Sequence, residues 1–151
     1  MPTIRPATAE DAEGATGVAR AAFTGYVERL GGVEPWPMSL DYAVLIEAGH
    51  TWVAEQDRQV VGVLVLEPHE DHLLLEILAV TPARQGSGLG TRLLDLAESQ
   101  ARDLGLPEVR LFTNMLMTEN LVFYPRHGYV ETHRDQVGPY HRVFFTKRLA
   151  G

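Results

Sequence analysis

The order of predicted elements indicates an α/β sandwich, in which helices pack on a mixed β-sheet. Three observations carry this prediction. Hydrophobic periodicity indicates helices within the first 50 residues and again over 88–104. Three apolar runs between residues 51 and 80, separated by polar turns, read as consecutive antiparallel strands. Beyond residue 105 a strand, a helix and two further strands follow, which gives a mixed sheet.

The chain is expected to begin with a short strand and a helix. Residues 4–6 read as the strand. Thr8, with the acidic Asp11 three residues later, matches a capping box, in which side chain and backbone bond reciprocally at a helix start. The helix that follows is expected to continue to residue 22 or 23.

A loop and a second helix are expected next. Two glycines and two prolines at 31–38 exclude regular structure. Ser39 is suited to cap a helix over 40–48, because its hydroxyl can accept a bond from an unpartnered first-turn amide. Gly49 is expected to end this helix, since glycine readily adopts the left-handed conformation of a C-terminal cap.

The centre of the chain is expected to form three consecutive antiparallel strands. Residues 51–55 and 60–66 are apolar runs that flank a polar turn of hairpin length. A second polar connection leads to the third strand, residues 73–80. The last third then begins with a helix over 88–104, whose apolar residues recur at helical spacing. Shorter elements follow: a strand over 109–113, a helix containing 120–124, and strands over 129–132 and 142–149.

Composition bounds the class of protein. The chain has 151 residues, of which 45% are hydrophobic and 22% charged, as expected of a single globular domain over 1–151. No apolar run approaches the ~18 residues of a membrane span, and the N-terminus lacks a signal-peptide layout. The absence of cysteine excludes disulfides, thiolate metal sites and an acyl-cysteine intermediate, and fits a cytoplasmic protein.

The net charge of −7 disfavours nucleic acid as a partner, because nucleic-acid binding leaves a basic footprint. An acidic field mildly favours a cationic amine substrate. Residues 69–72 combine histidines with acidic side chains, but four adjacent polar residues in a hairpin loop are usually solvated, so no metal is expected.

The most informative segment joins the third strand of the central run to the helix after it. Residues 85–90 read Gln-Gly-Ser-Gly-Leu-Gly. The first amides of a helix lack partners within it and carry partial positive charge, which attracts phosphate. Glycine lacks a Cβ and therefore lets these amides approach a ligand and adopt positive φ angles. The segment predicts an anion-binding turn; the alternative is a tight turn without a ligand.

Two common phosphate motifs fit this segment poorly. A P-loop requires lysine and then serine or threonine directly after its second glycine, where this chain has Leu89. A dinucleotide fingerprint places glycines at positions one, three and six, whereas Gly86, Gly88 and Gly90 occupy one, three and five. The segment instead resembles the acetyl-CoA-binding motif of the GNAT superfamily of N-acetyltransferases, Gln/Arg-x-x-Gly-x-Gly/Ala.

A second block carries the same resemblance, to the family's Asn-x-x-Ala-x-x-Phe-Tyr-x-x-x-Gly-Phe segment. The residues in the expected register are Asn120, Phe123, Tyr124, Gly128 and Tyr129. Pro125 departs from the pattern, because proline removes a helical hydrogen bond and clashes with the preceding turn. The helix is therefore expected to be short or bent just after Tyr124. The resemblance covers 50–149 and implies a GNAT-like, mostly antiparallel sheet with helices on both faces.

The resemblance implies a cytoplasmic transferase that moves an acetyl group from acetyl-CoA to an amine of a small molecule or peptide. It implies that main-chain groups of 78–80 pair with the pantetheine arm and that the Val80 amide polarises the thioester oxygen. Arg84 and Arg92 are candidate charge partners for phosphate. The expected cofactor-binding residues are Leu78, Ala79, Val80, Gln85, Gly86, Ser87, Gly88, Leu89, Gly90, Thr91, Asn120 and Phe123.

Two residues are candidates for catalysis. Tyr124 can protonate the leaving thiolate, since a phenol of pKa about 10 can donate to a thiolate whose conjugate acid has a pKa near 8.5. The alternative is a core aromatic residue. Glu76 lies in an apolar run and, by the period of two, shares a strand face with Leu78 and Val80, where desolvation favours a general base. The alternatives are a carboxylate without a chemical role and a water chain as base.

The candidate substrate contacts are Phe23, Tyr26, Trp36 and Met38, from the region that lines the acceptor pocket in the resembled fold. For Phe23, plain packing against the sheet is the alternative. Without cysteine, direct transfer in a ternary complex is the expected route. A catalytically silent acyl-CoA sensor or partner-binding module on the same fold is the alternative function. No nucleic-acid or membrane partner is expected, and the terminal strand over 142–149 offers an edge for a homodimer.

Overall fold

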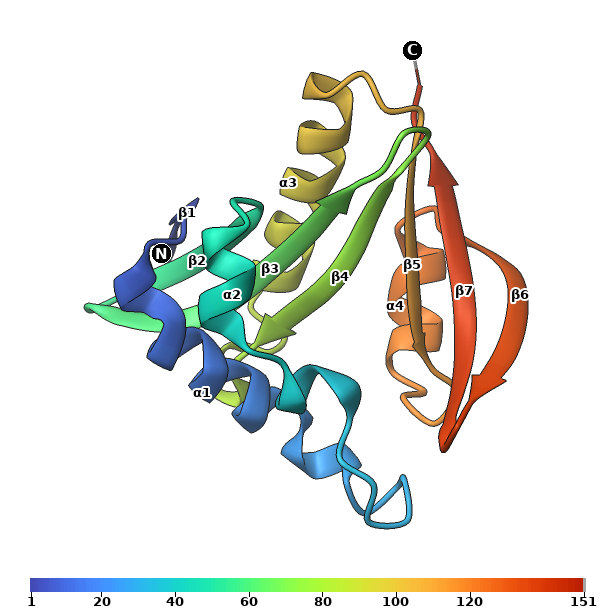
Figure 1. The fold of residues 1–151 in the computed structure, drawn as a ribbon, viewed down its shortest axis with the longest axis horizontal. Coiled ribbons are helices and arrows are strands. Elements are labelled where there is room, and N and C mark those ends of the chain that lie inside the picture. The colour runs from blue at the N-terminus through green and yellow to red at the C-terminus, as the bar shows by residue number, and fades with distance from the viewer. Residues whose placement is uncertain (151) are drawn as a thin grey trace.

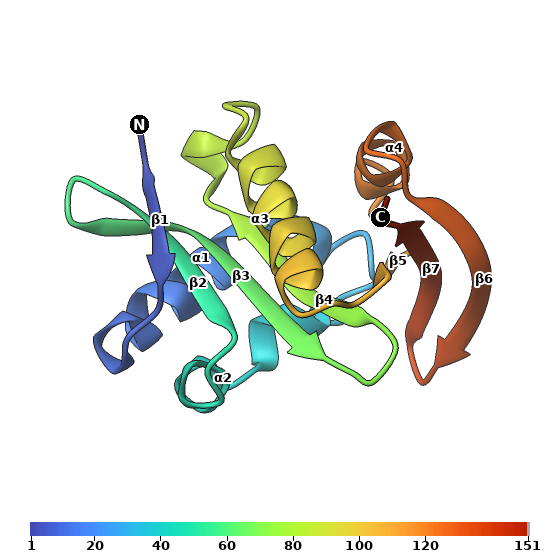
Figure 2. The same ribbon diagram turned by 90° about the horizontal axis from the view of Figure 1, so that it is seen from above.

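The computed structural model describes residues 1–150, which form one seven-stranded sheet with the strand order β1-β2-β3-β4-β5-β7-β6. Helices α1 and α2 cover one face and α3 and α4 the other (Figures 1 and 2). This confirms the predicted mixed, mostly antiparallel sheet with helices on both faces. The strands are β1 (Thr3–Pro6), β2 (Thr51–Gln56), β3 (Gln59–Pro68), β4 (Leu73–Val80), β5 (Glu108–Asn114), β6 (Val130–Val137) and β7 (Tyr140–Arg148). The helices are α1 (Ala12–Phe23), α2 (Tyr42–Glu47), α3 (Leu89–Asp103) and α4 (Asn120–Arg126).

The sheet opens between its two central strands, β4 and β5. These strands run parallel and pair only at Leu73 with Val109 and Leu74 with Arg110. Beyond Leu74 they diverge, as Figure 1 shows from the top of the molecule downward. β5 pairs with β7 along its whole length, and β4 pairs with β3. On the side of β4 that faces β5, the main-chain groups beyond Leu74 therefore have no strand to bond to.

Two apolar clusters hold the layers together. Under α3 and α4, Leu93 and Leu94 pack on Leu64 of β3 and Leu111 of β5. Under α1 and α2, a smaller cluster joins α1 to the opposite face of β2, β3 and β4, with Tyr42 fully buried in it. Because helices pack on both faces of the sheet, they hold β4 and β5 in their diverging arrangement.

A bulge in β4 changes the predicted orientation of Glu76. Val65 of β3 pairs with Ile77 and Leu66 pairs with Leu75, so Glu76 is an extra residue without an opposite partner. Leu75 packs in the cluster under α3, whereas Ile77 packs in the cluster under α1. The strict period of two is therefore interrupted at this point. The expectation that Glu76 shares a face with Leu78 and Val80 is wrong.

The start of α2 also differs from the prediction. Its cap is Asp41, whose Oδ1 accepts bonds from the amides of Ala43 at 3.1 Å and Val44 at 3.4 Å. Ser39 instead donates its hydroxyl to the carbonyl of Trp36, at the end of a 3₁₀ turn. The carboxylate acceptor lies next to the first helical residue, so α2 begins two residues later than predicted.

Two expectations for the C-terminal part need comment. The short helix is confirmed: α4 has seven residues and ends at Arg126, one residue after Pro125. The terminal strand β7 is not an edge, because it pairs with β5 on one side and β6 on the other. The edge strand at this end of the sheet is β6, which is longer than the predicted strand over 129–132. The expected pairing edge at 142–149 is therefore wrong.

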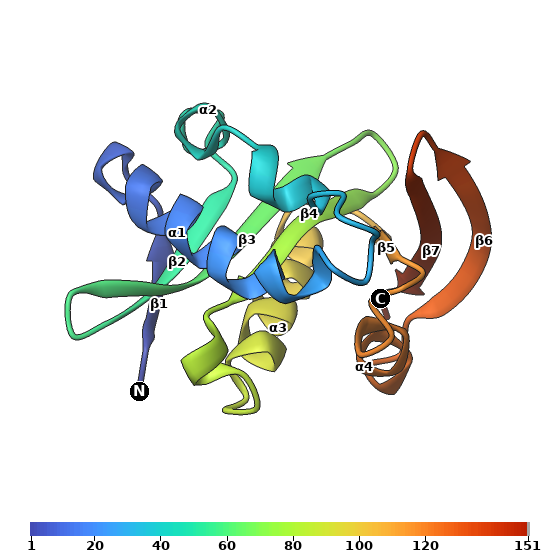
Figure 3. The ribbon, with the colours of Figure 1, turned by 90° about the horizontal axis from the view of Figure 1, so that it is seen from below.

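The α1–α2 segment (residues 24–41) reaches across the opening between β4 and β5. Figure 3 shows it passing from the end of α1 below the sheet toward the end of β5 before it returns to α2. It contains two short 3₁₀ turns, Thr24–Tyr26 and Trp36–Ser39. This segment therefore forms part of the walls of the opening described next.

Candidate active site

The glycine turn between β4 and α3 has the backbone shape that the sequence predicts. Gly86 and Gly88 have φ angles of 80° and 89°, which side chains other than glycine rarely adopt. Gly88 caps α3, and the first turn of the helix closes with a bond from the Arg92 amide to the Gly88 carbonyl at 3.1 Å. The amides before Arg92 therefore have no acceptor within the helix and remain available to an anion.

A cavity of about 400 Å³ lies against this turn. Its walls are the ends of β4 and α1, the glycine turn and the start of α4, and it is called the donor cleft below. Every expected cofactor-binding residue except Ser87 and Leu89 lines it. Leu89 is 2% exposed and packs in the core, within 3.3 Å of the position that a Cβ would take at Gly62. The Leu89 side chain therefore points away from the cleft, and the Ser87 hydroxyl donates to the Arg84 carbonyl within the turn.

Hydrogen bonds from two side chains fix the shape of the donor cleft. Gln85 Nε2 donates to the Val80 carbonyl at 3.1 Å, which ties the turn back to the end of β4. His127 places one ring nitrogen 2.8 Å from the Phe123 carbonyl and the other 3.2 Å from the Thr91 hydroxyl. This second contact joins α4 to α3. The sequence signals only the contact of His127 with Phe123, because the two residues lie four positions apart on a helix.

A second cavity, of about 300 Å³, lies next to residues 75–78 of β4 and is called the acceptor cavity below. The diverging strands β4 and β5, the α1–α2 segment, α4 and the hairpin between β6 and β7 line it. Phe23, Leu78 and Asn120 line both cavities. The donor cleft and the acceptor cavity therefore meet where β4 separates from β5.

Tyr124 lies in the wall of the acceptor cavity and is 5% exposed. Its ring packs on Tyr129 and Phe145, with centroids 5.8 and 6.0 Å apart. Its hydroxyl has no hydrogen-bond partner among residues 1–150. Burial raises the pKa of Tyr124 above the usual tyrosine value, so the phenol stays protonated at neutral pH. A protonated phenol beside the junction of the two cavities can act as a proton donor.

Glu76 also lines the acceptor cavity and is half-buried. Burial raises the pKa of its carboxyl, and the nearby Glu67 raises it further. His69 lies 2.7 Å from Glu67 rather than pairing with Glu76, and no other cation of residues 1–150 pairs with Glu76. An unpaired carboxylate of raised pKa is suited to accept a proton from an amine.

The expected substrate contacts divide between the two cavities. Trp36 lines the acceptor cavity, Phe23 lines both, and Tyr26 lines the donor cleft. Met38 lines neither: it is 6% exposed, and its carbonyl accepts a bond from Arg20 at 3.3 Å. The structure therefore does not bring Met38 to the site, because the 3₁₀ turn that starts at Trp36 directs the methionine inward.

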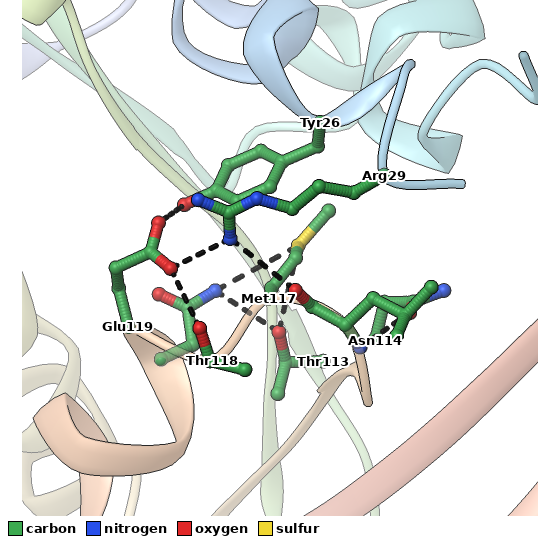
Figure 4. Close-up of polar contacts among 9 residues, drawn as sticks. Tyr26, Arg29, Thr113, Asn114, Met117, Thr118 and Glu119 are labelled. Atoms are coloured by element: carbon green, nitrogen blue, oxygen red, sulfur yellow. Dashed lines mark hydrogen bonds and ion pairs between the residues drawn. The ribbon is translucent and has the colours of Figure 1, made fainter. Parts of the chain in front are cut away.

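Glu119 is a residue of the site that the sequence did not reveal. Tyr26 donates its hydroxyl to Glu119 at 2.7 Å, and Arg29 forms an ion pair with it at 2.7 Å (Figure 4). The Arg29 bond, followed by the Tyr26 bond, lowers the pKa of Glu119 to about 2. Burial and Glu119 raise the pKa of Tyr26 to about 12. These contacts tie the α1–α2 segment to the start of α4 across the donor cleft.

Asn120 lies beside this link and is held by the end of β5. Its Nδ2 donates to the Thr113 hydroxyl at 3.0 Å and lies 3.8 Å from the Met117 sulfur. Figure 4 shows Thr113 and Met117 on the side of the link that faces β5.

Within residues 1–150 no three histidine, cysteine or acidic side chains gather as metal ligands would. No helix of the same region is long and apolar enough to span a membrane.

Comparisons with known proteins agree with this architecture. A model of the acetyltransferase (GNAT) domain matches residues 47–131. A mycothiol acetyltransferase of Jonesia denitrificans is 35% identical over 103 residues, which are 67% of this chain and 31% of that protein. An aminoalkylphosphonate N-acetyltransferase of Salmonella typhimurium is 33% identical over 56% of this chain and 58% of that protein. The chain thus spans less than two thirds of either curated relative.

Solved structures share the whole fold. A GCN5-related N-acetyltransferase from Rhodopseudomonas palustris superposes with a TM-score of 0.83 at 24% identity, covering 99% of this chain and 96% of that one. The PaiA N-acetyltransferase of Thermoplasma acidophilum, solved in complex with coenzyme A, has a TM-score of 0.80 at 21% identity and covers 99% of both chains. At these identities the likeness concerns the fold.

Proposed function

The chain belongs to the GNAT acetyltransferase family, and we propose that it transfers the acetyl group of acetyl-CoA directly to a primary amine. The observation that carries this proposal is the meeting of the donor cleft and the acceptor cavity at Leu78 and Asn120. A thioester held in one cavity and an amine held in the other would come together there. Holding both reactants close together accounts for a large part of the rate acceleration of a bimolecular transfer.

The donor cleft has the chemistry that a diphosphate requires. The positive φ angles of Gly86 and Gly88 and the unpaired first-turn amides of α3 favour an anion bound at the main chain. The free main-chain edge of β4 near Leu78 is suited to pair with the amide groups of an extended pantetheine arm. The Val80 amide is the proposed donor to the thioester oxygen, and a donor of this kind supplies ~3–4 kcal/mol to the transition state.

Two residues of the acceptor cavity would move the protons. Glu76 accepts one proton from the ammonium, directly or through a water, so that the nitrogen lone pair can attack the thioester carbonyl carbon. The new C–N bond forms as the C–S bond breaks. Tyr124 then donates its phenol proton to the departing thiolate, giving the free thiol of CoA. The nitrogen loses its second proton as the amide forms, and this proton returns to the Tyr124 phenolate directly or through water, while Glu76 releases its proton to solvent. No acyl-enzyme on cysteine is available, because the chain has no cysteine.

A thiol-release assay over a panel of primary amines tests the proposal. With acetyl-CoA present, we expect thiol to appear only when an amine is added, and mass spectrometry should find an equal amount of acetylated amine. Saturable binding of CoA without thiol release for any amine would instead favour a silent acyl-CoA-binding module. Intersecting rather than parallel lines in double-reciprocal plots are expected for direct transfer in a ternary complex.

A further inference from the structure

We propose that the acceptor cavity selects a compact primary amine with an aromatic or apolar body and rejects amines that carry a carboxylate. This inference rests on the proposed function for the identity of the reacting nitrogen. Three features of the acceptor cavity carry it: the aromatic side chains in its walls, the charges that face it, and its small volume beside a hydrogen bond that joins two of its lining segments.

The outer wall of the acceptor cavity is built from aromatic side chains. Trp36 of the α1–α2 segment lies 5.7 Å from Phe112 of β5, centroid to centroid, at an interplanar angle of 42°. Tyr140 at the start of β7 lines the same wall, and Phe23 and Leu75 line others. Tilted aromatic pairs at this spacing favour a further ring or an alkyl group over a hydrated polar chain.

The one cationic side chain in the wall, Arg142, is already neutralised. Its Nε and Nη2 donate to the two oxygens of Asp135 at 2.8 and 2.9 Å, in a bidentate pair between opposite residues of β6 and β7. The guanidinium also lies over the rings of Phe112 and Phe144, 5.0 and 5.2 Å from their centroids. Arg142 therefore extends the aromatic wall, and the carboxylate of Asp135 already balances its positive charge.

The remaining charge that faces the acceptor cavity is negative. Glu76 is the one acidic residue of residues 1–150 that lines it, and it has no cationic partner there. The negative charge of this carboxylate would stabilise a bound ammonium group. A carboxylate on the acceptor would lose its hydration in an apolar cavity and would lie near a like charge, without a free cation in compensation.

A hydrogen bond joins two distant segments that line the acceptor cavity. The Tyr140 hydroxyl donates to the Glu34 carbonyl at 2.8 Å, which joins the hairpin between β6 and β7 to the α1–α2 segment. The volume of about 300 Å³ lies at the lower end of ligand cavities. A peptide threaded between these segments would have to break that bond, whereas a small amine fits behind it.

Fluorescence of Trp36 provides a test that does not depend on catalysis. The chain has two tryptophans, and Trp52→Phe leaves Trp36 as the sole reporter in the cavity wall. This variant is titrated, with and without CoA, with 2-phenylethylamine, phenylalanine, putrescine and a tetrapeptide beginning with phenylalanine. We expect 2-phenylethylamine to bind at least ~10-fold more tightly than the other three, because phenylalanine adds a carboxylate, putrescine replaces the ring by a second ammonium group, and the tetrapeptide adds a polar chain.

A charge-freeing variant tests the role of Asp135. In the Trp52→Phe background, Asp135→Asn removes the carboxylate that neutralises Arg142, so phenylalanine should gain affinity and the preference for 2-phenylethylamine should fall at least ~3-fold. Glu131→Gln is the matched control. Glu131 forms an equally bidentate pair with Arg134 on β6, but Arg134, unlike Arg142, does not line the cavity. The preference should not change in this control.

The results separate this inference from the proposed function. Equal or tighter binding of phenylalanine, putrescine or the peptide in the Trp52→Phe protein overturns the inference, and so does a preference that Asp135→Asn leaves unchanged. Thiol release that is faster with phenylalanine also overturns it while upholding acetyl transfer. Selective binding of 2-phenylethylamine without thiol release from any amine upholds the cavity preference and contradicts the proposed function.

Discussion

At the scale of single residues, burial acts in the same direction on Tyr124 and Glu76 but gives them opposite tasks. It raises the pKa of Tyr124, which keeps the phenol protonated and able to donate. It also raises the pKa of Glu76, which brings a carboxylate closer to the range in which it accepts a proton at neutral pH. One apolar cavity therefore holds both the proposed acid and the proposed base.

Replacing Tyr124 by phenylalanine tests the proton donor. We expect kcat to fall ~10²-fold with little change in the affinity for acetyl-CoA, because the phenol acts on the leaving thiolate and not on the bound diphosphate. Steady-state kinetics and a binding titration measure the two quantities. Tyr129→Phe is the control, since Tyr129 is equally buried but bonds to Glu98 at 3.2 Å and lines neither cavity. An unaltered kcat in Tyr124→Phe removes the assigned role.

The gain in stability that Glu76→Gln gives over the wild type should depend on pH. A raised pKa in the folded state means that the neutral carboxyl is favoured there, so stability is lost as pH rises from the ordinary value of 4.5 through the raised one. The glutamine variant lacks this loss. Its Tm should exceed that of the wild type at pH 8 and match it near pH 4, as thermal melts can measure. Glu47→Gln, at an exposed site, is the control; an equal offset at both pH values would contradict the burial of charge.

Single residues also show where prediction from sequence ends. Local motifs pointed to Tyr124 and the glycines, and the structure places them in the walls of the two cavities. Met38 was misplaced, because its orientation depends on a 3₁₀ turn that hydrophobic periodicity does not reveal. Glu119 was missed, because its partners Tyr26 and Arg29 lie about ninety residues away in the chain.

At the scale of elements, the glycine turn is the best determined part of the site. Gly88→Val places a β-branched side chain at a φ of 89°, which costs ~1–2 kcal/mol and displaces the amides at the start of α3. We expect a folded protein without measurable CoA affinity. Gly105→Val introduces comparable strain at a φ of 72° beyond the other end of α3, far from the donor cleft.

Circular dichroism and a CoA titration distinguish the two glycine variants. Gly105→Val should lose stability but keep its CoA affinity. Comparable CoA affinity in both variants would show that backbone strain at Gly88 does not weaken CoA binding. This result would contradict a diphosphate bound at this turn.

The link from Glu119 to Tyr26 and Arg29 should restrain the α1–α2 segment. Glu119→Gln removes the charge that both partners bond, so hydrogen exchange should quicken in residues 24–41 while Tm stays nearly constant. Exchange followed by mass spectrometry measures this. Because the pKa of Glu119 is about 2 and that of Tyr26 about 12, the restraint should persist from pH 4 to 10. Glu131→Gln is the control, and unchanged exchange in 24–41 contradicts the restraint.

Element boundaries were predicted wherever local chemistry decides them. The hairpin of β2 and β3, the strand β4 and the helix α3 follow from apolar spacing and glycines. The cap of α2 was misassigned because Ser39 and Asp41 are both suitable caps, and only tertiary contacts select between them. The bulge at Glu76 was missed because the apolar run around it is continuous, so no break in alternation marks it.

At the scale of the whole molecule, the site depends on contacts between distant parts of the chain. The sequence indicated three neighbouring antiparallel strands, since short turns join them. It did not indicate that β7 would insert between β5 and β6, because that order requires pairing over long separations. Both cavities lie along the part of β4 from which β5 diverges.

Calorimetric titration of the full chain with coenzyme A tests the central claim most directly. We expect saturable heat with one coenzyme A per chain, and a rise in Tm that corresponds to about 2.7 kcal/mol of stabilisation when the ligand is at 100 times its Kd. No heat and no rise in Tm at millimolar coenzyme A would contradict a diphosphate site at residues 85–91, and the proposed acetyl transfer with it.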